Sequence, residues 1–449
     1  MKGEKGAPGT TINGSQSPFV TNRAVTNIVA NLNGGNDGIG FGNNAQGLAN
    51  QADYWGGLLP IPVNDLQNLI NTATGNVPTF TLPGSLSVTT GAGDDGVAIL
   101  GSIGGSVAAN LGSALTGTDG NRLVIGDTNA KNVSSSVGGA VSVVGGEQGD
   151  QVAIFATNVR GGVSLALGNG DNYAELQGPG ATIGAFAYTG GTGNDQAMLA
   201  NQLTVRNDVN VFTGPRGQDG FGMSSQARVN GSVVVNTGTA ADGDYIFISQ
   251  STIRRDLSLT TGAGDDGIGI FDSTIGGAAA VASNPGNDSI LVGGSTVGLS
   301  TVIDAGAGND SVSVVSFSTR SNLVVTLGAG NNVLTLNNAR AFAAFLYGGT
   351  GTNTLNTDAA TRTGVRALKY FRFQTVNDSP APGSCGSGVW RAVPGHLGTG
   401  RRGGRRTLDE RVAAAAAARI CKTAQRRLLP PPKPVLHQSQ MRSSAGSPV

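Results

Sequence analysis

The stretch GAGDDGIGIF at residues 262–271 decides the fold, because close copies of it recur along the chain. GAGDDGVAIL occupies 91–100 and GAGNDSVSVV occupies 306–315. Each copy is a Gly-rich acidic turn followed by alternating apolar residues, a pattern typical of a half-buried strand that leaves a tight turn. Three interpretations are open. The turn reverses the chain, holds a metal ion, or carries catalytic carboxylates.

The acidic or amide residue that ends each turn serves as an anchor and gives the repeat its period. From the second anchor onward most gaps lie between 21 and 26 residues, and four successive gaps are 22. A period of this length, without a helical segment between the strands, predicts stacked coils. The anchors are Asp37, Asp95, Asn121, Asp150, Asn172, Asp195, Asp219, Asp244, Asp266, Asp288, Asp310, Asn332 and Asn353.

Each repeat carries two short strands and a corner. Apolar pairs stand before and after the anchor, and around Asp266 these are Leu257, Leu259, Ile268 and Ile270. A Ser/Thr corner follows, which reads STI or STV at 251–253, 273–275 and 295–297. Two short strands cannot bury a face alone, so each strand must stack on its copy in the next repeat. The sequence therefore predicts an all-β fold, a single-stranded parallel β-helix (solenoid) of about 22 residues per coil.

The bulk composition agrees with a thin core. Gly accounts for 73 of 449 residues, aromatic residues for 5% and charged residues for 13%, which suits tight turns and small side chains. No apolar run predicts a transmembrane segment, and the N-terminus has no signal-peptide pattern. Both cysteines and both histidines lie beyond residue 384, which excludes Cys/His zinc sites and Ser-His-Asp triads from the preceding chain.

Charge divides the chain into an acidic body and a basic tail. Residues 361–449 carry 16 Lys and Arg against 3 Asp and Glu, a net charge of +13. The other 13 basic and 25 acidic residues give residues 1–360 a net charge of −12. We expect an irregular segment 1–85 with a candidate cap and one or two coils, a β-helix repeat domain 86–360, and a basic, low-complexity, mostly disordered tail 361–449. Nucleic acid is expected as a partner only through this tail.

The turns resemble those of bacterial surface and secreted right-handed parallel β-helix repeat proteins, in which Gly-x-Gly-Asn/Asp-Asp precedes x-apolar-x-apolar. The resemblance covers residues 86–357. It implies a non-enzymatic, extracellular or cell-surface protein that acts as a structural scaffold or adhesive module. Its implied partners are surface glycans or other surface proteins. The resemblance specifies neither a ligand nor an oligomeric state.

A second resemblance concerns calcium, the one cofactor that the sequence suggests. GGTGNDQAM at 190–198 is similar to the nonapeptide of repeats-in-toxin proteins, whose turns bind calcium. The period here is near 22 rather than 9, so the calcium roll itself does not carry over. Stacked turns still align carboxylates about 4.8 Å apart, where Ca²⁺ would relieve their repulsion. The competing interpretation is that Asp and Asn are plain turn residues. The candidate ligands are Asp244, Asp265, Asp266, Asp288 and Asp310.

Catalysis is the third interpretation, because some parallel β-helices are polysaccharide lyases or hydrolases. A pair such as Asp265 and Asp266 has the groups of a general acid and base, but a pair that recurs on every turn is expected to be structural. The irregular charged clusters, interpreted as solvated groups, are RRD at 254–256 and GPRGQDG at 214–220. We therefore predict no catalytic residue and no enzyme activity.

Overall fold

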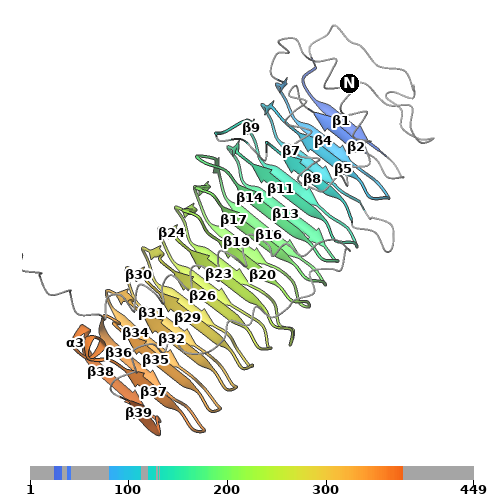
Figure 1. The fold of residues 1–449 in the computed structure, drawn as a ribbon. Coiled ribbons are helices and arrows are strands. Elements are labelled where there is room, and N and C mark those ends of the chain that lie inside the picture. The colour runs from blue at the N-terminus through green and yellow to red at the C-terminus, as the bar shows by residue number, and fades with distance from the viewer. Residues whose placement is uncertain are drawn as a thin grey trace, which may run out of the picture.

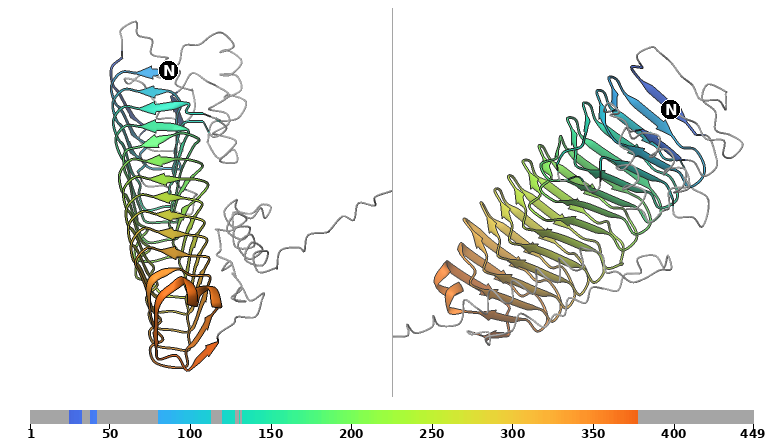
Figure 2. Two further views of the ribbon diagram at one scale, coloured as in Figure 1. Left: turned by 90° about the vertical axis from the view of Figure 1, so that its left-hand side faces the viewer. Right: turned by 45° about the horizontal axis from the view of Figure 1, so that its top comes forward.

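The chain forms one parallel β-solenoid, seen from the side in Figure 1 and along two further directions in Figure 2. The fold class predicted from the repeat is confirmed. Each coil contacts the coils before and after it, and strands in neighbouring coils lie about 4.8 Å apart. The computed structural model describes residues 25–32, 38–41, 80–112, 120–127, 130 and 132–377.

Two parallel sheets of fourteen strands form the long faces of the solenoid, because each coil gives one strand to each sheet. Sheet 1 contains β1 (Ile28–Asn31), β4 (Leu86–Thr89), β7 (Val107–Asn110), β10 (Val141–Val144), β13 (Val163–Gly168), β16 (Phe186–Gly190), β19 (Val209–Phe212), β22 (Val233–Asn236), β25 (Leu257–Thr260), β28 (Ala279–Ala282), β31 (Thr301–Asp304), β34 (Asn322–Thr326), β36 (Ala341–Tyr347) and β38 (Val365–Phe371). Sheet 2 contains β2 (Gly38–Phe41), β5 (Gly96–Ile99), β8 (Arg122–Ile125), β11 (Gln151–Phe155), β14 (Tyr173–Gln177), β17 (Gln196–Ala200), β20 (Gly220–Met223), β23 (Tyr245–Ser249), β26 (Gly267–Phe271), β29 (Ser289–Gly293), β32 (Ser311–Val315), β35 (Val333–Asn337), β37 (Thr354–Thr357) and β39 (Thr375–Asn377).

The predicted Ser/Thr corner is itself a short strand, so the coil has a third, narrower face. Strands of two or three residues stack there in two sheets. The first contains β3 (Thr81–Leu82), β6 (Ser102–Ile103), β9 (Ser135–Val137) and β12 (Thr157–Val159). The second contains β15 (Thr182–Ile183), β18 (Thr204–Val205), β21 (Arg228–Val229), β24 (Thr252–Ile253), β27 (Thr274–Ile275), β30 (Thr296–Val297) and β33 (Ser318–Thr319). One coil therefore runs through sheet 1, the acidic turn, sheet 2 and the third face.

The apolar alternation sets the register of the stack. Ile268 pairs with Ile246 in the preceding coil and with Ile290 in the following one. Such inward residues form one continuous hydrophobic core that extends from Phe41 to Val365. A shift of one residue would turn every inward side chain of a strand to the outside, so the pattern specifies a single register.

The described solenoid extends on both sides of the region 86–360. Strands β1 and β2 form its first coil, and β38 and β39 carry its last coil to Asn377. In that last coil α3 (Ala359–Gly364) lies between sheet 2 and sheet 1, where other coils have a third-face strand. The tail beyond residue 377, with its predicted disorder, lies outside the described residues. Among the described residues, no helix has the length and apolar character needed to span a membrane.

Candidate functional site

The anchor residues of the acidic turns form a buried hydrogen-bonded ladder along the solenoid. The backbone N–H of Asp244 donates to Oδ1 of Asp266 at 2.7 Å, and that of Asp266 donates to Oδ1 of Asp288 at 2.9 Å. The same hydrogen bond recurs at every anchor from Asp95 to Asn353: the backbone N–H of the anchor donates to a side-chain oxygen in the next coil. Each anchor thus satisfies a buried backbone donor of the coil before it.

Asparagine serves the ladder as well as aspartate does, because both carry the Oδ1 acceptor. The amide of Asn332 also donates from Nδ2, to the carbonyl of Leu327 at 3.3 Å and to Oδ1 of Asn353 at 3.0 Å. An Asn anchor therefore uses both of its polar side-chain atoms inside the turn. This accounts for the alternation of Asp and Asn that the repeat shows.

Three Asp anchors leave one oxygen without a partner. Oδ2 of Asp266, Asp288 and Asp310 is buried and accepts no hydrogen bond within the described structure. The hydroxyl of Thr261 faces the Asp266 carboxyl but donates to the carbonyl of Ser283 at 3.2 Å. A protonated carboxyl would use its Oδ2 as a donor, as the Asn amide does. These three positions therefore suit a neutral carboxyl better than a carboxylate.

Burial raises the pKa of the anchor carboxyls toward neutrality, because loss of water disfavours the charged form. Backbone N–H donors lower these pKa values in part, while neighbouring carboxyls raise them further for Asp219, Asp266 and Asp288. From an ordinary pKa of 3.8, the pKa rises to about 6 for Asp150, Asp244 and Asp310, about 7 for Asp195, Asp266 and Asp288, and about 8 for Asp219.

The residue before each anchor lies on the outside of the turn. Asp265 and Asn287 are exposed, and the backbone N–H of Asn287 donates to Oδ1 of Asp265 at 2.8 Å. Adjacent residues such as Asp265 and Asp266 therefore point in opposite directions. Of the five predicted calcium ligands, four lie in the buried ladder and Asp265 lies outside it. In the described ranges, no group of three or more His, Cys, Asp or Glu side chains is placed to hold a metal ion.

The irregular charged clusters do not form acid–base pairs. Arg254 and Arg255 are exposed, and Oδ1 of Asp256 accepts the backbone N–H of Ala278 at 2.8 Å. Arg216 is exposed, whereas Asp219 of the same segment is buried and belongs to the ladder. In neither segment do the arginine and the aspartate face each other as an acid–base pair would.

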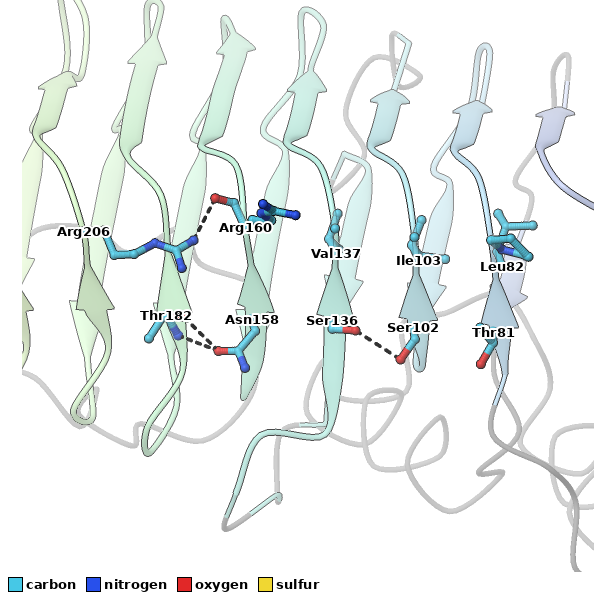
Figure 3. Close-up of a pocket in the computed structure, with 13 residues that line it drawn as sticks. Thr81, Leu82, Ser102, Ile103, Ser136, Val137, Asn158, Arg160, Thr182 and Arg206 are labelled. Atoms are coloured by element: carbon cyan, nitrogen blue, oxygen red, sulfur yellow. Dashed lines mark hydrogen bonds between the residues drawn. The ribbon is translucent and has the colours of Figure 1, made fainter.

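A shallow groove lies on the third face, with a volume of about 370 Å³ (Figure 3). It crosses β3, β6, β9, β12 and β15, with glycines in its floor at 104 and 138. A row of hydroxyl and amide groups follows its length, one from each coil. The hydroxyl of Ser136 donates to that of Ser102 at 3.1 Å, and Oγ1 of Thr182 donates to Oδ1 of Asn158 at 3.1 Å. The members of the row are Thr81, Ser102, Ser136, Asn158 and Thr182.

Two arginines close one end of this groove. The guanidinium of Arg206 reaches back across one coil and donates to the carbonyl of Val159 at 2.9 Å. It also donates to the carbonyl of Arg160 at 2.7 Å, the bond drawn in Figure 3. Arg160 lines the groove beside it. Within the described lining there is no carboxylate, so the groove presents donors and hydroxyls to a ligand.

Sequence reasoning missed the groove. Its residues come from six coils whose spacing varies from 21 to 34 residues at this corner, so the columns could be aligned only once the register was known. The available signal was a small or polar residue beside the inward Val or Ile of each corner.

Comparison with known proteins finds no matching family model, no similar curated protein and no similar solved structure. The architecture, a parallel β-solenoid with a repeat of about 22 residues, therefore rests on the structure itself.

Proposed function

We propose that this chain is a non-enzymatic, extracellular or cell-surface β-solenoid that acts as a scaffold or adhesive module and binds surface glycans. The observation that carries the proposal is the third-face groove. Its row of hydroxyl and amide groups, repeated once per coil, matches the repeated hydroxyls of a polysaccharide laid along the axis. Stacked strands hold the row rigidly, which lowers the entropic cost of binding an extended chain.

The placement of the carboxyls supports binding rather than glycoside cleavage. A glycosidase needs two carboxyl groups that flank the scissile bond, about 5–10 Å apart. The groove lining contains no carboxylate in the described residues, and the carboxyls with raised pKa values are enclosed in the ladder, apart from that of Asp272, which is exposed. A β-helix polysaccharide lyase or hydrolase is therefore the less favoured function.

The repeated Gly-x-Gly-Asn/Asp-Asp turns support an assignment to the bacterial surface and secreted class, and with it a location outside the cell. Labelling of intact source cells with an antibody against the solenoid tests this location. Signal on intact cells agrees with it, whereas signal only after permeabilisation contradicts it.

The test of glycan binding is retention of the full chain on immobilised neutral and acidic polysaccharides. We expect the chain to bind at least one polysaccharide class and to release no reducing sugar during long incubation. Release of sugar would replace the scaffold proposal with an enzyme. Absence of binding to every polysaccharide would contradict a glycan partner and leave protein partners for an adhesive module.

A calcium-binding repeat module is the second candidate, favoured by the unpaired Oδ2 atoms of Asp266, Asp288 and Asp310. A ligand that binds only the folded state at about 100 times its dissociation constant adds about 2.7 kcal/mol to the free energy of unfolding. Thermal melts of the full chain in millimolar calcium and in excess chelator measure this gain. A calcium-dependent rise that Asp266→Asn reduces would support the module, and identical melts would reject it.

A further inference from the structure

The arginines of the acidic body gather on the third face of the solenoid. Between residues 80 and 357 the described coils contain nine arginines, and seven of them lie on or directly beside third-face strands. Arg122 lies on sheet 2, and Arg216 lies at an acidic turn. The seven third-face arginines are Arg160, Arg206, Arg228, Arg254, Arg255, Arg320 and Arg340. We call them the arginine stripe.

The arginine stripe is exposed, and carboxylates do not neutralise it. All seven side chains are exposed, and none forms an ion pair within the described part of the chain. Most acidic residues lie instead at the turn between sheets 1 and 2, at the far side of each coil. Three carboxyl groups edge the third face. Asp208 and Asp256 each accept a backbone N–H, from Ser232 and Ala278, both at 2.8 Å, and Asp272 is exposed just before β27. The guanidinium groups of the stripe are therefore not held by carboxylates, although that of Arg206 donates to the carbonyls of Val159 and Arg160.

Three of the seven arginines share one column along the axis. Arg160, Arg206 and Arg254 each directly follow the inward residue of a third-face strand, on β12, β18 and β24. Their backbone positions stand two coils apart, about 10 Å along the solenoid, and the Arg206 side chain reaches back so that its guanidinium lies at the carbonyls of Val159 and Arg160. Gly184 occupies the corresponding position in the coil between Arg160 and Arg206, so no side chain rises between these two. Arg160 and Arg206 belong both to the stripe and to the end of the groove (Figure 3), and the other stripe members follow in later coils.

We propose that the third face binds an acidic polysaccharide, laid along the solenoid axis from the groove onto the arginine stripe. Carboxylate or sulfate groups pair with the planar guanidinium forks, which match such anions in two parallel hydrogen bonds. Sugar hydroxyls meet the row of Ser, Thr and Asn side chains in the groove. The inference rests on the proposed glycan-binding function and specifies its ligand class.

Features of the face favour a polysaccharide over the other polyanions. Single-stranded nucleic acid is held by aromatic side chains on which bases stack. Between residues 81 and 320 the described third face exposes no aromatic side chain, since Phe317 is buried. An anionic membrane surface would favour a band of exposed apolar side chains beside the arginines. The groove row is hydroxylic, and the large exposed apolar residues near the described third face, Val133, Leu299 and Phe342, lie in separate coils.

The test measures binding of the full chain to polygalacturonate, dextran sulfate and neutral dextran by titration calorimetry at low and moderate salt. The variant is Arg160→Gln/Arg206→Gln/Arg254→Gln, which removes three stripe charges and leaves the tail intact. We expect it to weaken binding of polygalacturonate or dextran sulfate at least tenfold and to reduce the salt dependence. Arg216→Gln, a matched loss of one exposed arginine elsewhere, should change the affinity less than twofold, whereas Arg206→Gln alone should weaken it several-fold.

Each other outcome has a defined meaning. Equal losses in Arg216→Gln and Arg206→Gln, or an unchanged triple variant, would overturn the arginine stripe as the site. If the wild type binds neutral dextran as tightly as it binds polygalacturonate and dextran sulfate, glycan binding stands and only the acidic ligand fails. If no polysaccharide binds, the glycan proposal fails as well. Tighter binding to single-stranded DNA or to anionic phosphatidylserine vesicles, lost in the triple variant, would replace the polysaccharide with that polyanion.

Discussion

At the scale of single residues, close stacking of coils determines which turn glycines are required. Gly328 has a φ of +71° and Gly180 a φ of +74°, so both carry the same backbone preference. A Cβ at Gly328 would overlap the carbonyl oxygen of Gly306 in the preceding coil, whereas a Cβ at Gly180 would meet nothing within 4 Å. We expect Gly180→Ala to lower the free energy of unfolding by about 1–2 kcal/mol. We expect Gly328→Ala to lower it by at least about 3 kcal/mol.

Urea denaturation of both variants beside the wild type measures the difference. Because the two glycines have nearly the same φ, backbone strain contributes equally to both losses in the free energy of unfolding. The difference between the two losses therefore measures the contact between coils. Equal losses would show that the left-handed backbone alone selects glycine at these turns.

The ladder makes a second residue-scale prediction. Asp266→Asn keeps the Oδ1 that accepts the N–H of Asp244 and replaces the unpaired Oδ2 with a donor. We expect the variant to be more stable than the wild type by about 1 kcal/mol at pH 8, where the carboxyl is charged. At pH 5, where the carboxyl is protonated, the gain should disappear. Denaturation at both pH values measures it, and a variant less stable than the wild type at pH 8 would contradict the donor role.

The sequence predicted the position of Asp266 but not its chemistry. Stacking requires the same residue type in every coil, so the anchor repeats visibly in the sequence. Whether its second oxygen finds a donor depends on the rotamer of a neighbouring hydroxyl, which no repeat encodes. Arg160 and Arg206 escaped notice for a related reason. They lie 46 residues apart in sequence and become neighbours only when the variable corners are in register.

At the scale of elements, the last coil replaces a third-face strand with the helix α3, which the side chain of Asp358 holds in place. Its carboxylate accepts the N–H of Thr361 at 2.8 Å as the helix N-cap, and the N–H of Asn338 at 3.1 Å. We expect Asp358→Ala to cost about 1–2 kcal/mol, mostly through opening of the last coil. The control is Thr363→Ala, because the Thr363 hydroxyl only donates back within the same helix. It should cost less than about 0.5 kcal/mol.

Hydrogen exchange of the amides in β37 and β38 measures this local effect. Faster exchange in Asp358→Ala, with unchanged exchange in the central strands, fits a stabilising end element. Uniform acceleration along the solenoid would contradict it.

Element boundaries could be predicted only where the repeat is regular. The strand pairs around each turn follow directly from the apolar alternation. The turn that leads into the third face could not be predicted in this way. Ala156, Gln250 and Ser316 adopt a positive φ there, a conformation that a glycine usually signals in a sequence. Helix α3 was also hidden, since net charge placed the tail boundary at residue 361, inside the helix. The chain becomes basic at residue 361, whereas the described solenoid continues to Asn377.

At the scale of the whole molecule, charge and burial are segregated across the coil. The carboxyls that must be ordered lie in the buried ladder, and the arginines lie on the third face. Because each coil repeats the arrangement, small effects add along the rod as they do in other solenoids. The stability of the molecule should therefore respond to pH as a column of coupled groups rather than as one residue.

The folded-state pKa values of the ladder, about 6 to 8, lie above the ordinary value of 3.8. The folded state therefore holds protons that the unfolded state releases, and this stabilisation is fully present below about pH 4. It is lost as the pH rises from about 4 to about 8. We expect the urea midpoint of the solenoid to fall steadily over this range, measured in chelator to exclude metal effects.

The matched control is Asp266→Asn/Asp288→Asn/Asp310→Asn, which removes three of the titrating groups and keeps every Oδ1 acceptor. Its midpoint should depend less on pH and exceed that of the wild type at pH 8. A wild-type midpoint that rises with pH would mean that the ladder carboxyls are charged in the folded protein, and that a bound cation or an unrecognised donor compensates their burial.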